Sequence, residues 1–275
     1  MRRRFEGKVV LAVGAGSEGE GWSIGRATAV SFAREGAAVM VVDIRAEAAE
    51  EARRLIAAEG GTGIAHAADA SDPGAVSQFV ERCRSELGPI NVLYNNVGIM
   101  AFGTGVELAV EDWDRVMAVN ARSPFLACKA VLPDMIAAGR GAIVNVSSIA
   151  ATRWTGARYL PYSASKAAII GFTRALALEY AAHGIRVNCV VPGYVDSPMM
   201  RGGLERRLGR DAVEQEVARR HAACPLGRLA TGWDPAYPVC CQMPAPCVCC
   251  RCPVSPQGAF WLGALAALRG TLSIF

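Results

Sequence analysis

The stretch KVVLAVGAGSEGEGWSIG, residues 8–25, decides the fold class of this chain. It begins with a short apolar run, typical of a buried parallel strand, and continues into a glycine-rich turn. A segment with helical periodicity follows over residues 24–35 and ends at Gly36, a residue type that commonly caps helices. Glycines let the backbone approach a pyrophosphate, and the first N–H groups of a helix can bind one. Because a strand precedes the turn and a helix follows it, we interpret the turn as a nucleotide site in preference to a flexible loop.

The alternation of strand and helix continues along the chain. Further strands are expected at residues 38–42, 64–68, 90–94, 142–146 and 185–191, and helices at 46–59, 72–87, 111–138 and 159–182. The helix over 111–138 is expected to bend or break near Pro124, which lacks a backbone N–H. This order predicts an α/β fold with a doubly wound, Rossmann-type parallel sheet in a single catalytic domain, residues 1–233.

Residues suited to binding fall at or just after the carboxyl ends of these predicted strands. They are Gly14, Asp43, Asp69, Asn95, Ser148, Pro192 and Gly193. Ligands of doubly wound sheets bind at that edge. Core packing alone does not explain the coincidence, so we expect the functional site there.

Tyr162 and Lys166 are four residues apart and share one face of a predicted helix. An ammonium close to a phenol favours the phenolate and lowers the pKa of the phenol. The tyrosine would then exchange a proton with an alcohol oxygen near neutral pH. Ser148 lies fourteen residues upstream of Tyr162 and could hold the same oxygen. Taken alone, the Tyr–Lys spacing is equally compatible with a solvated lysine on an amphipathic helix.

Asp43 ends the second predicted strand. A carboxylate at this position accepts hydrogen bonds from an adenosine ribose and repels a 2′-phosphate. Arg45 is close by and could instead bind such a phosphate. The strand-end position of Asp43 favours NAD over NADP as the cofactor.

Together these motifs resemble the short-chain dehydrogenase/reductase family of the classical type. The matching elements are the glycine-rich turn, Asp43, Asp69, Asn95-Asn96-Val97-Gly98, Asn120, Ser148, Tyr162, Lys166 and Pro192-Gly193, in order over residues 5–233. The resemblance implies an NAD-dependent oxidoreductase that transfers hydride reversibly between a secondary alcohol or ketone and the nicotinamide.

The resemblance also implies a role for individual residues. Tyr162 is the general acid/base, Lys166 lowers its pKa and holds the nicotinamide ribose, and Ser148 orients the substrate oxygen. Asn120 supports a water that connects Lys166 to solvent. Ser147 is an alternative to Ser148, but the family pattern places the active hydroxyl second. Besides Tyr162 and Lys166, the expected cofactor-binding residues are Gly14, Ser23, Ile24, Gly25, Asp43, Asp69, Asn95, Gly98, Pro192, Gly193, Val195 and Ser197.

Residues 197–224 are expected to form a substrate lid. Met199, Met200 and Leu204 suggest that the substrate has an apolar part. Four arginines of the lid could form an anion site, but a solvated helix face is the favoured interpretation. They are Arg201, Arg206, Arg207 and Arg210.

The segment over residues 234–275 departs from the family pattern. Its prolines at 235, 238, 244, 246, 253 and 256 predict no regular helix and no central strand, so the last strand of the sheet is expected to be missing or replaced. A frameshift is the favoured explanation. A metal-binding tail and a disordered or membrane-touching extension are the alternatives. Cys247, Cys249, Cys250 and Cys252 lack paired C-x-x-C spacing, so no metal site is predicted.

Composition narrows the remaining choices. The net charge of +4 comes without a basic stripe interleaved with aromatics, so no nucleic-acid partner is expected. The apolar run over residues 259–268 is too short to span a bilayer, so we expect a cytoplasmic protein with no membrane partner and a small alcohol or ketone as substrate. A homo-oligomer is usual for the family, but the tail leaves the assembly open. The alternative function is a nucleotide-binding protein whose turnover the tail impairs or abolishes.

Overall fold

A single sheet organises the structure, a computed structural model that describes residues 3–242 and 260–263. The strand order is β3-β2-β1-β4-β5-β6-β7. The strands are β1 (Val9–Val13), β2 (Ala38–Asp43), β3 (Thr62–Ala67), β4 (Val92–Asn95), β5 (Gly141–Val146), β6 (Ile185–Val191) and β7 (Phe260–Gly263). The first six are parallel, and β7 pairs antiparallel with β6. The order reverses between β1 and β4, where a doubly wound sheet opens a crevice for ligands.

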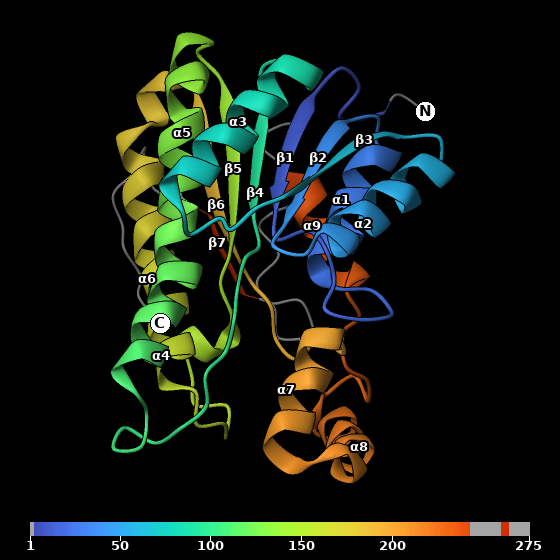
Figure 1. The fold of residues 1–275 in the computed structure, drawn as a ribbon, viewed down its shortest axis with the longest axis vertical. Coiled ribbons are helices and arrows are strands. Elements are labelled where there is room, and N and C mark those ends of the chain that lie inside the picture. The colour runs from blue at the N-terminus through green and yellow to red at the C-terminus, as the bar shows by residue number, and fades with distance from the viewer. Residues whose placement is uncertain (1–2, 243–259, 264–275) are drawn as a thin grey trace.

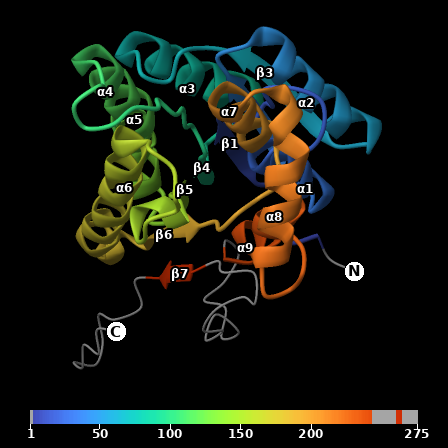
Figure 2. The same ribbon diagram turned by 90° about the horizontal axis from the view of Figure 1, so that it is seen from below.

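Helices cover both faces of the sheet (Figures 1 and 2). One face carries α1 (Ile24–Arg34), α2 (Ala46–Ala58) and α9 (Trp233–Gln242), and the other carries α3 (Pro73–Leu87), α4 (Val110–Met117), α5 (Ser123–Ala137) and α6 (Leu160–Glu179). Each face of the sheet carries a hydrophobic core, and strand β1 contributes side chains to both. Val10 and Ala12 pack on the α1 side, while Leu11 and Val13 pack on the α3 side. Burial on both faces explains why the strands read as continuous apolar runs.

Two helices, α7 (Pro198–Leu208) and α8 (Val213–Ala223), lie beyond the carboxyl edge of the sheet (Figure 1, orange). They follow β6 directly along the chain. Residues 197–224, expected from the sequence to form a substrate lid, include both helices.

Local signals in the sequence explain where several helices begin. The Ser23 hydroxyl caps α1 by accepting a hydrogen bond from Arg26 N at 3.0 Å. Asp72 caps α3 in the same way, with Pro73 at the first helical position. The expected break near Pro124 is a π-helical turn, Ala118–Arg122, that joins α4 to α5.

The prediction that prolines exclude a regular helix after residue 233 is wrong for α9. Pro235 lies in the first turn, where a backbone N–H has no partner within the helix. The carboxylate of Asp234 caps this end by accepting hydrogen bonds from Thr231 N at 2.7 Å and Thr231 Oγ1 at 2.9 Å. Val239 and Cys240 are buried in the core on the α1 side, and this burial compensates for the N–H that Pro238 lacks.

The glycine-rich turn is fixed by the same C-terminal helix. The rings of Trp22 and Trp233 lie 4.4 Å apart, and the Arg34 guanidinium lies 4.5 Å from the Trp233 ring centre. Because Trp22 belongs to the turn and Arg34 to α1, α9 stabilises the strand–turn–helix unit that starts the fold. The cysteines at 247, 249, 250 and 252 lie outside the described residues.

Beyond β6, the four-residue strand β7 occupies the edge as an antiparallel strand, so the parallel part of the sheet has six strands. The expected change at the last strand therefore takes the form of a replacement. Within the part of the chain that the structure describes, no helix combines the length and apolarity needed to cross a membrane.

Candidate active site

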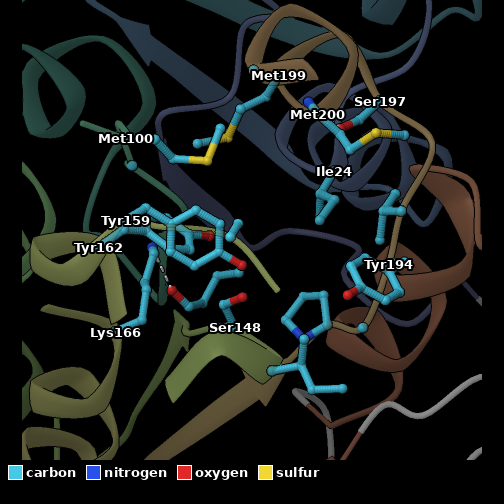
Figure 3. A pocket seen from close by; sticks show the side chains of 18 of the residues that line it. Ile24, Met100, Ser148, Tyr159, Tyr162, Lys166, Tyr194, Ser197, Met199 and Met200 are labelled. Carbon is cyan, nitrogen blue, oxygen red and sulfur yellow. Dashed lines mark hydrogen bonds between the residues drawn. The ribbon is translucent and has the colours of Figure 1, made fainter. Parts of the chain in front are cut away.

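A pocket opens at the carboxyl edge of the sheet, between α6 and the segment that follows β6 (Figure 3). Tyr162, Lys166 and Ser148 lie on one side of it, and Tyr194 and Ser197 lie on the other (Figure 3). Apolar side chains, among them Met100 and Met200, line much of the rest. The pocket therefore combines a small polar group with a largely apolar wall, which is typical of small-molecule sites.

Lys166 is buried, with only 3% of its surface exposed. Its ammonium donates hydrogen bonds to Val97 O at 3.1 Å and to Val146 O at 2.9 Å. These carbonyls lie just after β4 and at the end of β5, so the lysine ties α6 to two neighbouring strand ends. Burial lowers the pKa of Lys166 to about 8. Two of the three ammonium donors are engaged by these bonds, which leaves one for another acceptor.

Tyr162 precedes Lys166 by about one helical turn and lines the pocket. The Lys166 ammonium lies 5.8 Å from the centre of the Tyr162 ring. Burial raises the pKa of Tyr162 to about 12, a hydrogen bond with Ser148 lowers it in part, and Tyr159 raises it. The expected depression of this pKa by Lys166 is therefore wrong, because desolvation dominates and the ammonium is held by backbone carbonyls.

The two serines after β5 have different environments. Ser147 is buried, and its hydroxyl donates a hydrogen bond to Lys166 O at 2.6 Å. Ser148 accepts a hydrogen bond from Ala150 N at 3.2 Å and lines the pocket beside Tyr162. The Ser148 hydroxyl also forms the hydrogen bond with Tyr162, so it lies beside the phenol at the pocket wall. The geometry favours Ser148 over Ser147 as the group that orients a substrate.

Asn120 is fully buried in the π-helical turn and lines neither the pocket nor the groove described below. Its side chain accepts a hydrogen bond from Ile99 N at 2.8 Å and donates to Ile99 O and Ser165 Oγ, each at 3.0 Å. These partners are distant in sequence, so Asn120 is not a residue that merely bonds within its own helix. It fixes the segment after β4 against the helix that carries Tyr162 and Lys166.

A groove adjoins the pocket and runs along the ends of β1, β2 and β4. It is lined by Gly14, Gly16, Asp43, Arg45, Asp69 and other residues, and it shares Ser23, Asn96, Gly98 and Met199 with the pocket. The shared residues make the groove and the pocket one continuous site. An extended ligand in the groove would therefore place one end beside Tyr162.

The turn requires glycines at two positions because neighbouring segments lie very close to its backbone there. A Cβ at Gly16 would lie 2.5 Å from Asp43 Oδ2, and one at Gly14 would lie 2.7 Å from Val97 N. Asp43 accepts hydrogen bonds from Gly16 N at 3.0 Å and from Arg45 N at 3.1 Å. The N-terminus of α1 faces the same space. A groove that combines a backbone cradle with a strand-end carboxylate beside it fits a dinucleotide.

The structure brings most of the predicted residues to this site. Ser23, Ile24, Gly98, Ser148, Tyr162, Lys166, Pro192, Gly193, Val195 and Ser197 line the pocket, and Gly14, Asp43 and Asp69 line the groove.

The prediction that Asn95 binds the cofactor does not fit the structure. Asn95 is 2% exposed, and its amide donates to Asn145 Oδ1 at 2.9 Å inside the core. Successive strand residues face opposite sides, so the next residue, Asn96, lines the groove and donates to Gly14 O at 2.7 Å. Gly25 is not a lining residue either. Its lack of a side chain lets α1 approach the turn, because a Cβ there would lie 2.3 Å from Gly14 O.

Sequence reasoning missed several lining residues. They are Met100, Phe102, Tyr194 and Arg220, together with Asn96. Arg207 also lines the pocket, although the sequence favours a solvated helix face over an anion site for it. Alternation along β4 could have identified Asn96. The others come from loops and lid helices, whose placement no local pattern determines.

Comparison with known proteins identifies the family. The family model for short chain dehydrogenase matches residues 8–207. This chain belongs to the short-chain dehydrogenase/reductase family.

Relatives share most of the length of this family member. Cyclohexanol dehydrogenase of Acinetobacter sp. (strain SE19) is 37% identical over 231 residues, which cover 83% of this chain and 84% of that protein. The 2-(S)-hydroxypropyl-CoM dehydrogenase 3 of Xanthobacter autotrophicus is 33% identical over 277 residues, with 99% of each chain covered. The crystal structure of levodione reductase superposes with a TM-score of 0.81 at 29% identity and covers 88% of this chain and 92% of that one. The chain is thus an oxidoreductase of a family that uses a nicotinamide cofactor.

The two serines give a matched test of the site. We expect Ser148→Ala to lower kcat/KM by roughly 100-fold or more, because it removes the hydroxyl that is expected to hold the substrate oxygen. Ser147→Ala is expected to keep most of the turnover and to lower the free energy of unfolding by about 1 kcal/mol, through loss of the buried hydrogen bond. Steady-state kinetics and urea unfolding of both variants measure these effects. Equal losses of turnover in the two variants would contradict the assignment.

Proposed function

We propose that this short-chain dehydrogenase/reductase transfers hydride reversibly between a secondary alcohol or ketone and NAD, with Tyr162 as the general acid/base. The single observation that carries the proposal is the continuity of the groove with the pocket that holds Ser148, Tyr162 and Lys166. The alcohol dehydrogenase and ketone reductase among the relatives support this substrate class. The nicotinamide supplies the hydride acceptor or donor when it is bound.

The choice of NAD rests on Asp43. Its carboxylate lines the groove and is held by two backbone N–H groups, so it cannot turn away without losing both hydrogen bonds. A ribose with free hydroxyls can donate hydrogen bonds to it, whereas a 2′-phosphate would meet a like charge. Arg45 does not offset this repulsion fully, because its Nε lies 3.7 Å from the same carboxylate and is paired with it.

Proton transfer is assigned to Tyr162 Oη. Burial raises the pKa of Tyr162 to about 12, which keeps the phenol protonated at neutral pH and suits the donation of a proton to a ketone oxygen. Ser148 would hold that oxygen by donating its hydroxyl proton. The charge of Lys166 would stabilise the phenolate left after the transfer, and the same groups would act in reverse order when an alcohol is oxidised.

Lys166 and Asn120 position the elements of the site before any chemical step. Lys166 fixes α6 against the ends of β4 and β5, and Asn120 fixes the segment after β4 against α6. The remaining donor of the ammonium is available to the nicotinamide ribose. We assign residues 197–224 as the lid that excludes water from the pocket, because α7 and α8 lie beyond the carboxyl edge of the sheet and supply lining residues.

The Tyr162→Phe variant tests the general acid/base role. It removes only the hydroxyl, so we expect turnover to fall by roughly 100- to 10,000-fold while NADH affinity stays within about twofold. Ketone reduction is followed by NADH absorbance, and binding by NADH fluorescence. Normal turnover in the variant would refute the role. Wild-type NADH binding without turnover of any ketone or secondary alcohol would favour a nucleotide-binding protein in its place.

The Asp43→Ser variant tests cofactor preference. Serine still offers an oxygen to Gly16 N but carries no charge, so we expect NADH to bind roughly 10-fold more weakly and NADPH to bind more tightly than in the wild type. Adding Arg45→Ala should remove the gain for NADPH, because Arg45 is the cation released from Asp43. Fluorescence titration of both cofactors measures the preference. An unchanged NADH to NADPH ratio in Asp43→Ser would contradict the assignment.

A further inference from the structure

Two arginines of the lid helices line the substrate pocket. Arg207 comes from α7 and Arg220 from α8. Apart from these two, the charged lining residue is Lys166, whose ammonium is held by backbone carbonyls. No aspartate or glutamate occurs among the described residues that line the pocket. The charged side chains among the described lining residues of the pocket are therefore all cationic.

Arg207 has an unused donor. Its Nε is buried and has no hydrogen-bond partner among the described residues. Its Nη2 lies 3.6 Å from Glu216 Oε1, beyond the range of a good hydrogen bond. A buried donor without a partner is costly, and a native structure that keeps one usually holds it for a ligand, an ion or water.

Charge balance around this arginine leaves an excess of positive charge. Three guanidiniums, those of Arg207, Arg219 and Arg220, converge on the single carboxylate of Glu216. Arg220 Nε donates to Glu216 at 2.9 Å and its side chain is 10% exposed, whereas the Arg219 side chain is 67% exposed. One buried carboxylate cannot neutralise the two arginines that face the pocket.

The other lid arginines are accounted for differently. Arg201 is paired with Asp196 and Glu214, and Arg210 is 87% exposed. The interpretation of the lid arginines as a solvated helix face fits Arg210 but does not fit Arg207, whose side chain is 25% exposed and points its Nε into the protein.

Aromatic rings connect the arginines to the reacting groups. The Arg220 guanidinium lies 4.8 Å from the centre of the Tyr194 ring. Both arginines also act electrostatically on Tyr159, whose ring lies 5.3 Å from that of Tyr162. Apolar residues, Phe102 and Leu204 among them, line the same pocket. The pocket thus combines Tyr162, apolar side chains and a pair of cations.

We propose that the substrate is a ketone or secondary alcohol that carries a carboxylate or similar oxyanion at the end of a short apolar chain, and that Arg207 and Arg220 bind this anion. The proposal rests on the proposed function and adds its substrate class. A guanidinium binds a carboxylate through two parallel N–H groups, and the unpaired Nε of Arg207 can supply one of them.

The test compares a keto acid with a neutral ketone of equal chain length, 5-oxohexanoate and 2-hexanone, in the full-length protein. We expect the wild type to reduce the keto acid with a kcat/KM roughly 10- to 100-fold higher than the neutral ketone, as a charge-assisted pair allows. Arg207→Met should remove this advantage, mainly by raising KM for the keto acid, and should change kcat/KM for the neutral ketone by no more than about twofold. Arg207→Lys should restore part of the advantage.

Arg219→Met is the matched control. It also removes a guanidinium from Glu216, but Arg219 is exposed and does not line the pocket. We expect the control to keep the preference for the keto acid. The proposal is overturned if the wild type shows no preference for the keto acid. It is also overturned if Arg207→Met lowers kcat/KM for both substrates equally, or if Arg219→Met loses the preference as Arg207→Met does.

Direct binding separates this proposal from the proposed function. Calorimetric titration with hexanoate and hexanamide requires no turnover. Tighter binding of hexanoate than of hexanamide in the wild type, lost in Arg207→Met, would support the anion site even if no ketone is reduced. The lack of ketone reduction would then count against the proposed function alone. Equal binding of the two compounds would overturn the anion site.

Discussion

The buried ammonium of Lys166 is the interaction on which the site depends. It donates to the carbonyls of Val97 and Val146, and these carbonyls belong to segments that adjacent parallel strands deliver to one edge of the sheet. A buried cation needs such partners, since desolvation without them costs several kcal/mol. The lysine therefore fixes the position of α6, and with it Tyr162, relative to Ser148 after β5. Replacing Lys166 by an apolar residue would leave two carbonyls without their donor and the tyrosine without its positive neighbour.

A second set of contacts, made by Gly14 and Gly16, shapes the groove next to Lys166. Gly14 and Gly16 allow the turn after β1 to lie against Val97 and Asp43, and Asn96 donates to the turn at Gly14 O. Val97 also supplies one acceptor of Lys166, so the turn and the lysine meet at the same segment after β4. Trp22, packed against Trp233, extends this contact network to α9. The glycine-rich turn is thus held by packing against α9.

The fold could be predicted because buried parallel strands leave a strong signal in the sequence. The strand expected at 185–191 matches β6, and the helix break near Pro124 occurs where a missing N–H requires it. Ser148, Tyr162 and Lys166 were predictable because helix spacing and strand ends place them on a common edge. The raised pKa of Tyr162 was not predictable, since desolvation depends on how neighbouring segments pack. The helix at 233–242 was also missed, because its stability comes from burial against α1 and outweighs the local effect of proline. Arg207 could not be separated from its solvated neighbours for the same reason.

The pH dependence of ketone reduction tests the central role of the Lys166 charge most directly. Burial gives Lys166 a pKa of about 8, and in the proposed mechanism a charged lysine stabilises the phenolate that forms when Tyr162 donates its proton. At saturating NADH, kcat/KM for a neutral ketone should be constant near neutral pH and should fall as the pH rises above about 8, because deprotonation removes the charge. A profile that stays flat well above this range, in an enzyme that remains folded, would contradict the account.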